Sequence, residues 1–189
     1  MNALPLQREQ VLSIIAITTL FLWAIAALCL FVFHLPLVPL QLDLYNGLLG
    51  LVLGVAISGV SYLLYRYIPP FRASADEKFA LVVAPLTYPD LLWLGLLPGL
   101  SEELLFRGIL LPSLGLNWLG IIGSSLVFGI LHLSQPRFCL YVLCVIGIGI
   151  IFALVTISTG STFTTTVAHI TTNILSAWLW KLYLGRPAS

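Results

Sequence analysis

The sequence predicts an all-α protein, a polytopic transmembrane helical bundle of about six spans. Of the 189 residues, 60% are hydrophobic and only 8% are charged, whereas about 25% of the residues of an ordinary soluble domain are charged. Apolar runs of the length that crosses a bilayer, about 20 residues, follow one another along the chain. Prolines, turn residues and the few charges separate these runs. We therefore expect residues 1–189 to form a single integral membrane domain in contact with the lipid bilayer.

The first two spans are expected within residues 1–89. Residues 11–33 form an apolar run without a charged side chain, and residues 45–68 form a second run. Small residues allow helices in a membrane to approach closely. The second run contains the glycines Gly47, Gly50, Gly54 and Gly59.

A stretch with prolines and charges follows the second span. The consecutive prolines at 69–70 end it, because proline cannot donate a backbone hydrogen bond. Charges cluster over residues 71–78, which predicts a water-exposed connection. Residues 79–89 are apolar but contain two prolines, so we expect them to enter the membrane interface rather than to span the bilayer.

Residues 90–184 are expected to supply the remaining spans. Pro98 and Pro112 should bend the first of these helices, since each removes a backbone donor. Asn117 lies at the turn that follows. The predicted spans cover residues 90–116, 118–133, 138–157 and 161–184.

Basic residues predict the orientation, because cytoplasmic loops keep Lys and Arg. With the N-terminus inside the cell, every basic residue except Arg107 falls at a cytoplasmic end or loop, and the opposite connections carry none. The cytoplasmic set is Arg8, Arg66, Arg72, Lys78, Arg137, Lys181 and Arg186. The sequence thus predicts a multi-pass membrane protein with both termini in the cytoplasm.

Charge and cysteine usage exclude other classes. The net charge is +1 and no basic run could follow a phosphate backbone, so nucleic acid is not an expected partner. The cysteines lie inside apolar runs at spacings that suggest neither a disulfide framework nor a zinc ribbon. Their positions are Cys29, Cys139 and Cys144.

Glu102, Glu103 and Arg107 lie in the middle of the third predicted span, where ionisable groups are costly and usually face a packed or watery interior. Glu103 and Arg107 are four residues apart and share a helix face, which predicts a structural ion pair. Glu102 is rotated from Glu103 by about 100°. It is left as an acid without a cation, and a general base requires such a group.

His132 ends the fourth span, and His169 with Asn173 lies on the sixth. Each has an ordinary explanation, as a helix-end histidine, a packing residue or an interhelical hydrogen-bond donor. About 15 residues separate His132 from the turn at Asn117, nearly the separation of Glu102 from the same turn, so these two side chains should meet about 21 Å from it. His169 lies only about 10 residues beyond the turn before its own span, so it should lie at a somewhat different depth in the membrane unless the helices tilt. Polar residues nearer the span ends are expected to be solvated, namely His34, Asp43 and Asp90.

The polar residues fall into three short motifs. Residues 102–107 read E-E-x-x-x-R, residues 128–132 read F-x-x-x-H and residues 169–173 read H-x-x-x-N. In this order, on separate apolar helices, they resemble the motifs of the CAAX prenyl protease and bacteriocin-processing family of intramembrane proteases, CPBP or Abi. The resemblance covers residues 99–178 and includes Gly108 after the arginine.

The resemblance implies that residues 90–184 form a CPBP-type catalytic core, preceded by the N-terminal spans and loop of residues 1–89. It implies an intramembrane endopeptidase that hydrolyses a peptide bond in a membrane-associated protein or peptide. Glu102 and His132 would activate water, and His169 and Asn173 would form the oxyanion hole. The remaining pair, Glu103 and Arg107, would hold the site in shape.

A metallo-type mechanism is the alternative for the same residues. A carboxylate with two imidazoles is a known catalytic zinc set, and Glu102, His132 and His169 would supply it. The chain has no H-E-x-x-H, the motif of soluble zinc proteases. We favour water activated by glutamate with no required cofactor, and keep Zn²⁺ as the alternative.

Two other functions compete with proteolysis. A catalytically idle membrane chaperone or immunity-type binding protein could keep the fold, but here every motif side chain is present. A transporter could use the same Glu and His residues as a transit site. Transport would favour polar groups at several depths, whereas these residues gather into one constellation.

Overall fold

The computed structural model describes residues 6–133 and 139–184, and every regular element among them is a helix. The predicted all-α class is therefore confirmed. The predicted connection at 134–137 and the start of the fifth span at Phe138 lie outside the described residues. The elements are α1 (Arg8–Phe31), α2 (Leu44–Tyr67), α3 (Pro69–Val82), α4 (Asp90–Glu103), η1 (Leu104–Leu110), α5 (Leu111–Leu114), α6 (Trp118–Leu131), α7 (Cys139–Thr159), α8 (Phe163–Leu179) and η3 (Trp180–Leu184).

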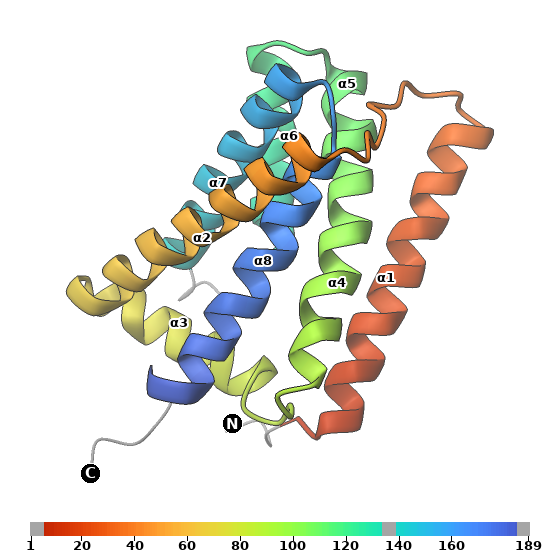
Figure 1. Ribbon diagram of the computed structural model, residues 1–189. Coiled ribbons are helices and arrows are strands. Elements are labelled where there is room, and N and C mark those ends of the chain that lie inside the picture. The colour runs from red at the N-terminus through yellow and green to blue at the C-terminus, as the bar shows by residue number, and fades with distance from the viewer. Residues whose placement is uncertain (1–5, 134–138, 185–189) are drawn as a thin grey trace.

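The helices form a bundle in which successive long segments alternate in direction (Figure 1). The start of α1 and the end of η3 lie at the same end of it. Three helical segments in the described part are long and apolar enough to cross a membrane, namely Arg8–Phe31, Leu44–Tyr67 and Leu140–Thr159. The chain is thus an integral membrane protein with fewer clear spans than predicted. At 14 residues, α6 is only about 21 Å long at 1.5 Å per residue.

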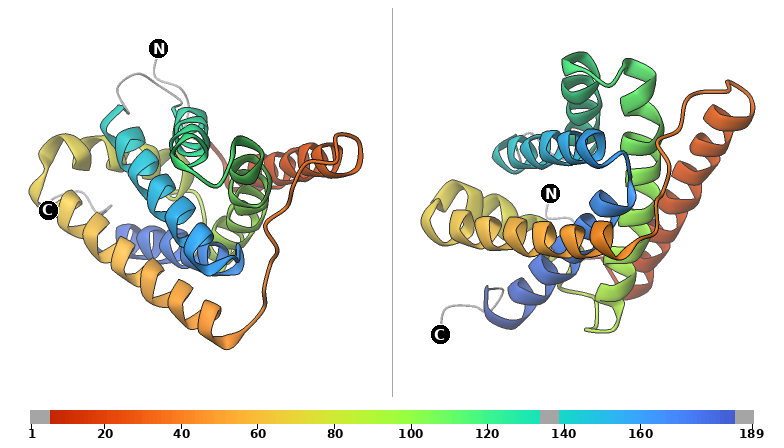
Figure 2. Two further views of the ribbon diagram at one scale, coloured as in Figure 1. Left: turned by 90° about the horizontal axis from the view of Figure 1, so that it is seen from above. Right: turned by 45° about the horizontal axis from the view of Figure 1, so that its top comes forward.

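α8 lies at the centre of the bundle, between α2 and α4, while α1 packs at the edge beside α4 (Figure 2). Glycines make these contacts possible, as predicted for the second span. A Cβ atom at Gly54 of α2 would lie 2.7 Å from the carbonyl oxygen of Ala168, and one at Gly95 of α4 would lie 3.1 Å from that of Ile170. α8 is therefore held from two sides by helices that approach its backbone.

The third predicted span is a continuous helical stretch, but its middle is a π-helix, η1, which the sequence did not predict. Pro98 lies inside α4, and Pro112 lies in the first turn of α5. Pro112 cannot donate to the carbonyl of Gly108, four residues earlier. That carbonyl instead accepts from the backbone N–H of Val38 at 2.8 Å. The proline thus frees an acceptor that ties the α1–α2 connection to η1.

The prediction that residues 71–78 form a water-exposed connection was wrong. They belong to α3, in which Phe71 and Ala75 are buried. Phe71, Ala75 and Phe79 are spaced by four residues, so they share one helix face, and Phe79 packs on Trp180 with ring centroids 5.8 Å apart. Beyond α3, Val83 is also buried in the protein core.

Asp90 was expected to be solvated, but the structure buries it. The Arg8 guanidinium donates to both carboxylate oxygens, at 2.7 and 2.6 Å, and the backbone N–H and hydroxyl of Thr87 each donate to one of them at 2.7 Å. A carboxylate with this many donors tolerates burial. The pair joins the first turn of α1 to that of α4.

Candidate active site

Glu102, His132 and His169 come together although they lie on different helices. Glu102 is in the last turn of α4, His132 follows the end of α6, and His169 is in the middle of α8. The Oε2 atom of Glu102 lies 3.7 Å from Nε2 of His132 and 3.8 Å from Nε2 of His169. One carboxylate oxygen thus faces two imidazole nitrogens at nearly equal distances. The height difference expected for His169 is removed by the tilt of the helices.

In each of the two histidines, the ring nitrogen that does not face Glu102, Nδ1, has a hydrogen-bond partner of its own. Nδ1 of His132 lies 2.8 Å from the carbonyl oxygen of Phe128, and Nδ1 of His169 lies 2.9 Å from Oε1 of Glu103. Both partners are acceptors, so each Nδ1 carries the proton. In the neutral rings, Nε2 then presents a lone pair toward Glu102.

The space between these side chains is therefore bounded by acceptors. Two imidazole Nε2 atoms and the Oε2 atom of Glu102 face it, and that oxygen is buried without a hydrogen-bond partner among the described residues. A buried acceptor without a partner costs free energy. A water molecule, which has two protons to donate, satisfies acceptors in this arrangement.

Glu103 and Arg107 lie behind this space. Both residues are fully buried, and a guanidinium nitrogen of Arg107 lies 2.9 Å from Oε1 of Glu103. The predicted ion pair is thus present. The same guanidinium stacks over the ring of Phe128, 4.3 Å from its centroid. Because Oε1 of Glu103 also accepts from His169, the pair on the α4–η1 helix is joined to α8.

Phe128 is the aromatic residue of the second motif, and it supports both histidines. Its ring centroid is 4.6 Å from that of His132 and 6.0 Å from that of His169. Phe106 of η1 packs edge-on against it, with centroids 5.1 Å apart. Packing against the ring of Phe128 therefore restricts the orientation of both imidazole rings.

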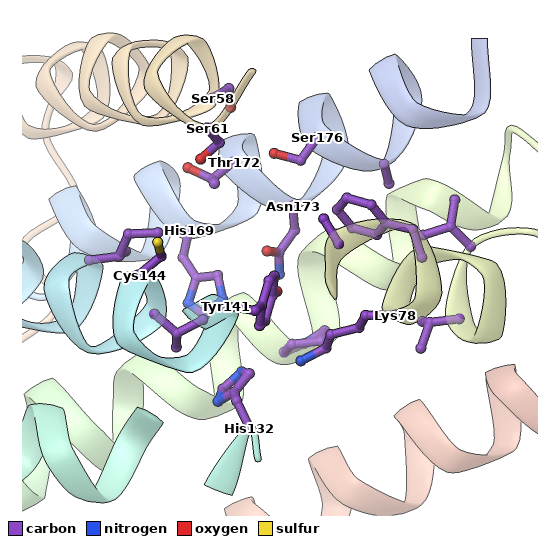
Figure 3. Close-up of a pocket in the computed structure, with 18 of the residues that line it drawn as sticks. Ser58, Ser61, Lys78, His132, Tyr141, Cys144, His169, Thr172, Asn173 and Ser176 are labelled. Carbon is purple, nitrogen blue, oxygen red and sulfur yellow. The ribbon is translucent and has the colours of Figure 1, made fainter. Parts of the chain in front are cut away.

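A cavity of about 250 Å³ opens in front of the cluster. Glu102, His132, His169 and Asn173 line it, whereas Glu103 and Arg107 do not. Figure 3 shows His169 and Asn173 extending from the same side of α8 toward the cavity. Most of the other lining side chains are apolar. The arrangement places a polar cluster at one wall of an apolar pocket, which is the general form of a ligand-binding site.

Sequence reasoning missed three features of this site. The hydrogen bond between His169 and Glu103 joins residues that are 66 positions apart, and no local pattern indicates it. Lys78 and Tyr141 also line the cavity. The four-residue spacing of apolar residues in α3 could have indicated a helix there, and hence that Lys78 lies close to the core.

Zinc coordination requires donor atoms about 2.0–2.2 Å from the ion. Within residues 6–133 and 139–184, no group of three His, Cys, Asp or Glu side chains is arranged to hold a metal ion. Glu102, His132 and His169 would be the ligands of such an ion, and their side chains would have to move to bind it.

Residues 84–175 match the family model described as type II CAAX prenyl endopeptidase Rce1-like. The matched segment contains all three motifs. No curated protein matches the chain, and no solved structure does.

Proposed function

We propose that the chain is an intramembrane endopeptidase, because residues 84–175 match the family model described as type II CAAX prenyl endopeptidase Rce1-like. Its substrate is a membrane-associated protein or peptide, and its reaction is hydrolysis of a peptide bond by activated water. Residues 90–184 supply the catalytic core. The N- and C-termini face the cytoplasm, where the basic residues place them.

One observation carries the proposal. Oε2 of Glu102 lies 3.7 and 3.8 Å from the Nε2 atoms of two histidines and has no hydrogen-bond partner within residues 6–133 and 139–184. These distances are too long for direct hydrogen bonds. They leave the carboxylate free to take a proton from a water molecule that stands among the three side chains.

In the proposed reaction, Glu102 is the general base. Water donates one hydrogen bond to its carboxylate and the other to Nε2 of His132. Glu102 takes the first proton while the water oxygen attacks the peptide carbonyl carbon. It then gives this proton to the leaving amine nitrogen as the C–N bond breaks. The base is thus regenerated without another proton donor.

Asn173 and His169 stabilise the oxyanion that forms on the carbonyl oxygen. The amide group of Asn173 is a donor that needs no change of charge. For Nε2 of His169 to donate, the ring has to gain a second proton, and the Glu103 carboxylate at Nδ1 would balance the positive charge of that form. Both side chains lie on one face of α8, one turn apart, so a single carbonyl oxygen can accept from both.

Glu103 and Arg107 act as positioning residues. Neither lines the cavity, but their ion pair holds the carboxylate that orients His169. In the alternative mechanism, Glu102, His132 and His169 would be zinc ligands and Zn²⁺ would polarise the carbonyl. An activity assay after metal removal distinguishes the two mechanisms.

The purified protein in lipid vesicles tests the function. A quenched fluorescent peptide of the prenylated CAAX type is supplied to the parent and to Glu102→Gln, which keeps the size of the side chain but removes its basicity. We expect cleavage by the parent and none by the variant, with equal thermal unfolding. If the parent does not cleave this peptide, and comparison of membrane-protein termini in cells with and without it shows no processing, the chain is an idle scaffold of the same fold.

A further inference from the structure

Lys78 occupies the catalytic cavity, although no step of the proposed reaction uses it. It projects from α3 and lines the same pocket as Glu102, His132 and Asn173. Among the described residues that line this pocket, Lys78 is the only Lys or Arg, and Glu102 is the only Asp or Glu. A cation and the proposed general base thus share one mostly apolar pocket.

The ammonium group of Lys78 is held by an aromatic ring. Its Nζ atom lies 4.3 Å from the centroid of the Tyr141 ring on α7. Figure 3 labels both side chains at the cavity. Phe71 stacks with the same tyrosine at a centroid distance of 6.5 Å. A cation–π contact orients an ammonium group but leaves its charge without a counter-ion.

No acidic side chain of the described residues forms an ion pair with Lys78. Burial lowers the pKa of Lys78 to about 8, and the negative charge of Glu102 opposes the shift. The helix that carries it, α3, is not among the spanning segments. At neutral pH, Lys78 therefore carries a positive charge that forms no ion pair with the part of the chain that the structure describes.

Resting on the proposed function, we infer that Lys78 binds a carboxylate of the substrate peptide and thereby selects peptides cleaved close to an anionic group. Carboxylates are the anionic groups of an unmodified peptide, and a partly desolvated ammonium pairs with them strongly. Because Lys78 and Glu102 line one cavity, the bound carboxylate lies within a few residues of the scissile bond. It belongs to a free C-terminus or to an acidic side chain, and the experiment separates these sources.

Binding without turnover is the direct test. Three fluorescent lipidated peptides are titrated into Glu102→Gln protein in vesicles. Two share one sequence and end in a free carboxylate or in an amide, and the third is an amide whose last residue is replaced by glutamate. The same titrations are made with Lys78→Met, Lys78→Gln and Lys78→Arg added. Lys181→Met is the matched control, since Lys181 also contacts a tyrosine ring, that of Tyr88, but does not line the cavity.

We expect the free-acid peptide to bind about 10-fold more tightly than the amide, a difference of about 1.4 kcal/mol. Lys78→Met and Lys78→Gln should remove this preference without weakening amide binding, whereas Lys78→Arg and Lys181→Met should keep it. Tight binding of the amidated glutamate peptide would assign the carboxylate to a side chain. Equal binding of all three peptides, a preference that survives in Lys78→Met, or no binding of any peptide would overturn the inference. Failure of the proposed function is a different result, the absence of cleavage by the parent.

Discussion

Nδ1 of His169 and Oε1 of Glu103 lie 2.9 Å apart in the interior of the bundle. The same oxygen of Glu103 lies 2.9 Å from the guanidinium of Arg107. This shared oxygen links an ion pair on one helix to an imidazole on another. It also determines which nitrogen of His169 faces the cavity. Glu103 does not line the cavity, but it determines which ring nitrogen of His169, a residue that does line it, carries the proton.

Replacing Arg107 with alanine should destabilise the protein, because it leaves the Glu103 carboxylate buried without its cation. Breaking a buried pair in this way costs about 3–5 kcal/mol. Thermal unfolding of the variant and the parent in vesicles measures the effect. The double variant Glu103→Gln with Arg107→Met, which buries no unpaired charge, should recover part of the loss. Unchanged unfolding with lost cleavage would instead give Arg107 a direct catalytic role.

Asn173→Ala should lower kcat by about 10²–10³, the scale for the loss of one oxyanion-hole donor. The substrate KM should change little, because the donor acts mainly on the charge that develops during the reaction. Ser176→Ala is the control, since Ser176 lines the cavity on the same helix and has no proposed role. Equal losses in the two variants would contradict the assignment of Asn173.

Removal of metal should leave cleavage intact if Glu102 activates water directly. The enzyme is treated with a chelator, its metal content is measured, and the same sample is assayed on the quenched peptide. Activity that falls on chelation and returns with Zn²⁺ would reject the metal-free scheme. In that case Glu102, His132 and His169 would be zinc ligands.

Reporter fusions at the two ends of the chain should both report from the cytoplasm. The physical reason is the retention of basic residues on that side, together with the return of η3 to the end of the bundle where α1 begins. A reporter inserted after residue 159, in the α7–α8 connection, should report from the opposite side. A terminus found outside would contradict both the orientation and the count of six spans.

Local pattern in the sequence was sufficient for the helical class, most helix ends and the Glu103–Arg107 pair. These features depend on neighbours within a few residues: the length of an apolar run, Asn117 capping α6, or two charges four residues apart. Through their resemblance to a family, the motifs also identified four polar residues that line the cavity, namely Glu102, His132, His169 and Asn173. Their catalytic roles stay predictions.

Only the tertiary structure decided how those residues meet. His169 contacts Glu103 and Arg8 buries Asp90, and each of these contacts joins residues that are 66 or more positions apart. Lys78 reaches the cavity from a helix whose tilt no local pattern specifies. Such contacts depend on how closely α8 packs against α2 and α4, and this depends on glycines on one helix facing backbone atoms on another. A helix face can be predicted from the sequence because its period is local. The partner of that face is set by the packing of the whole bundle.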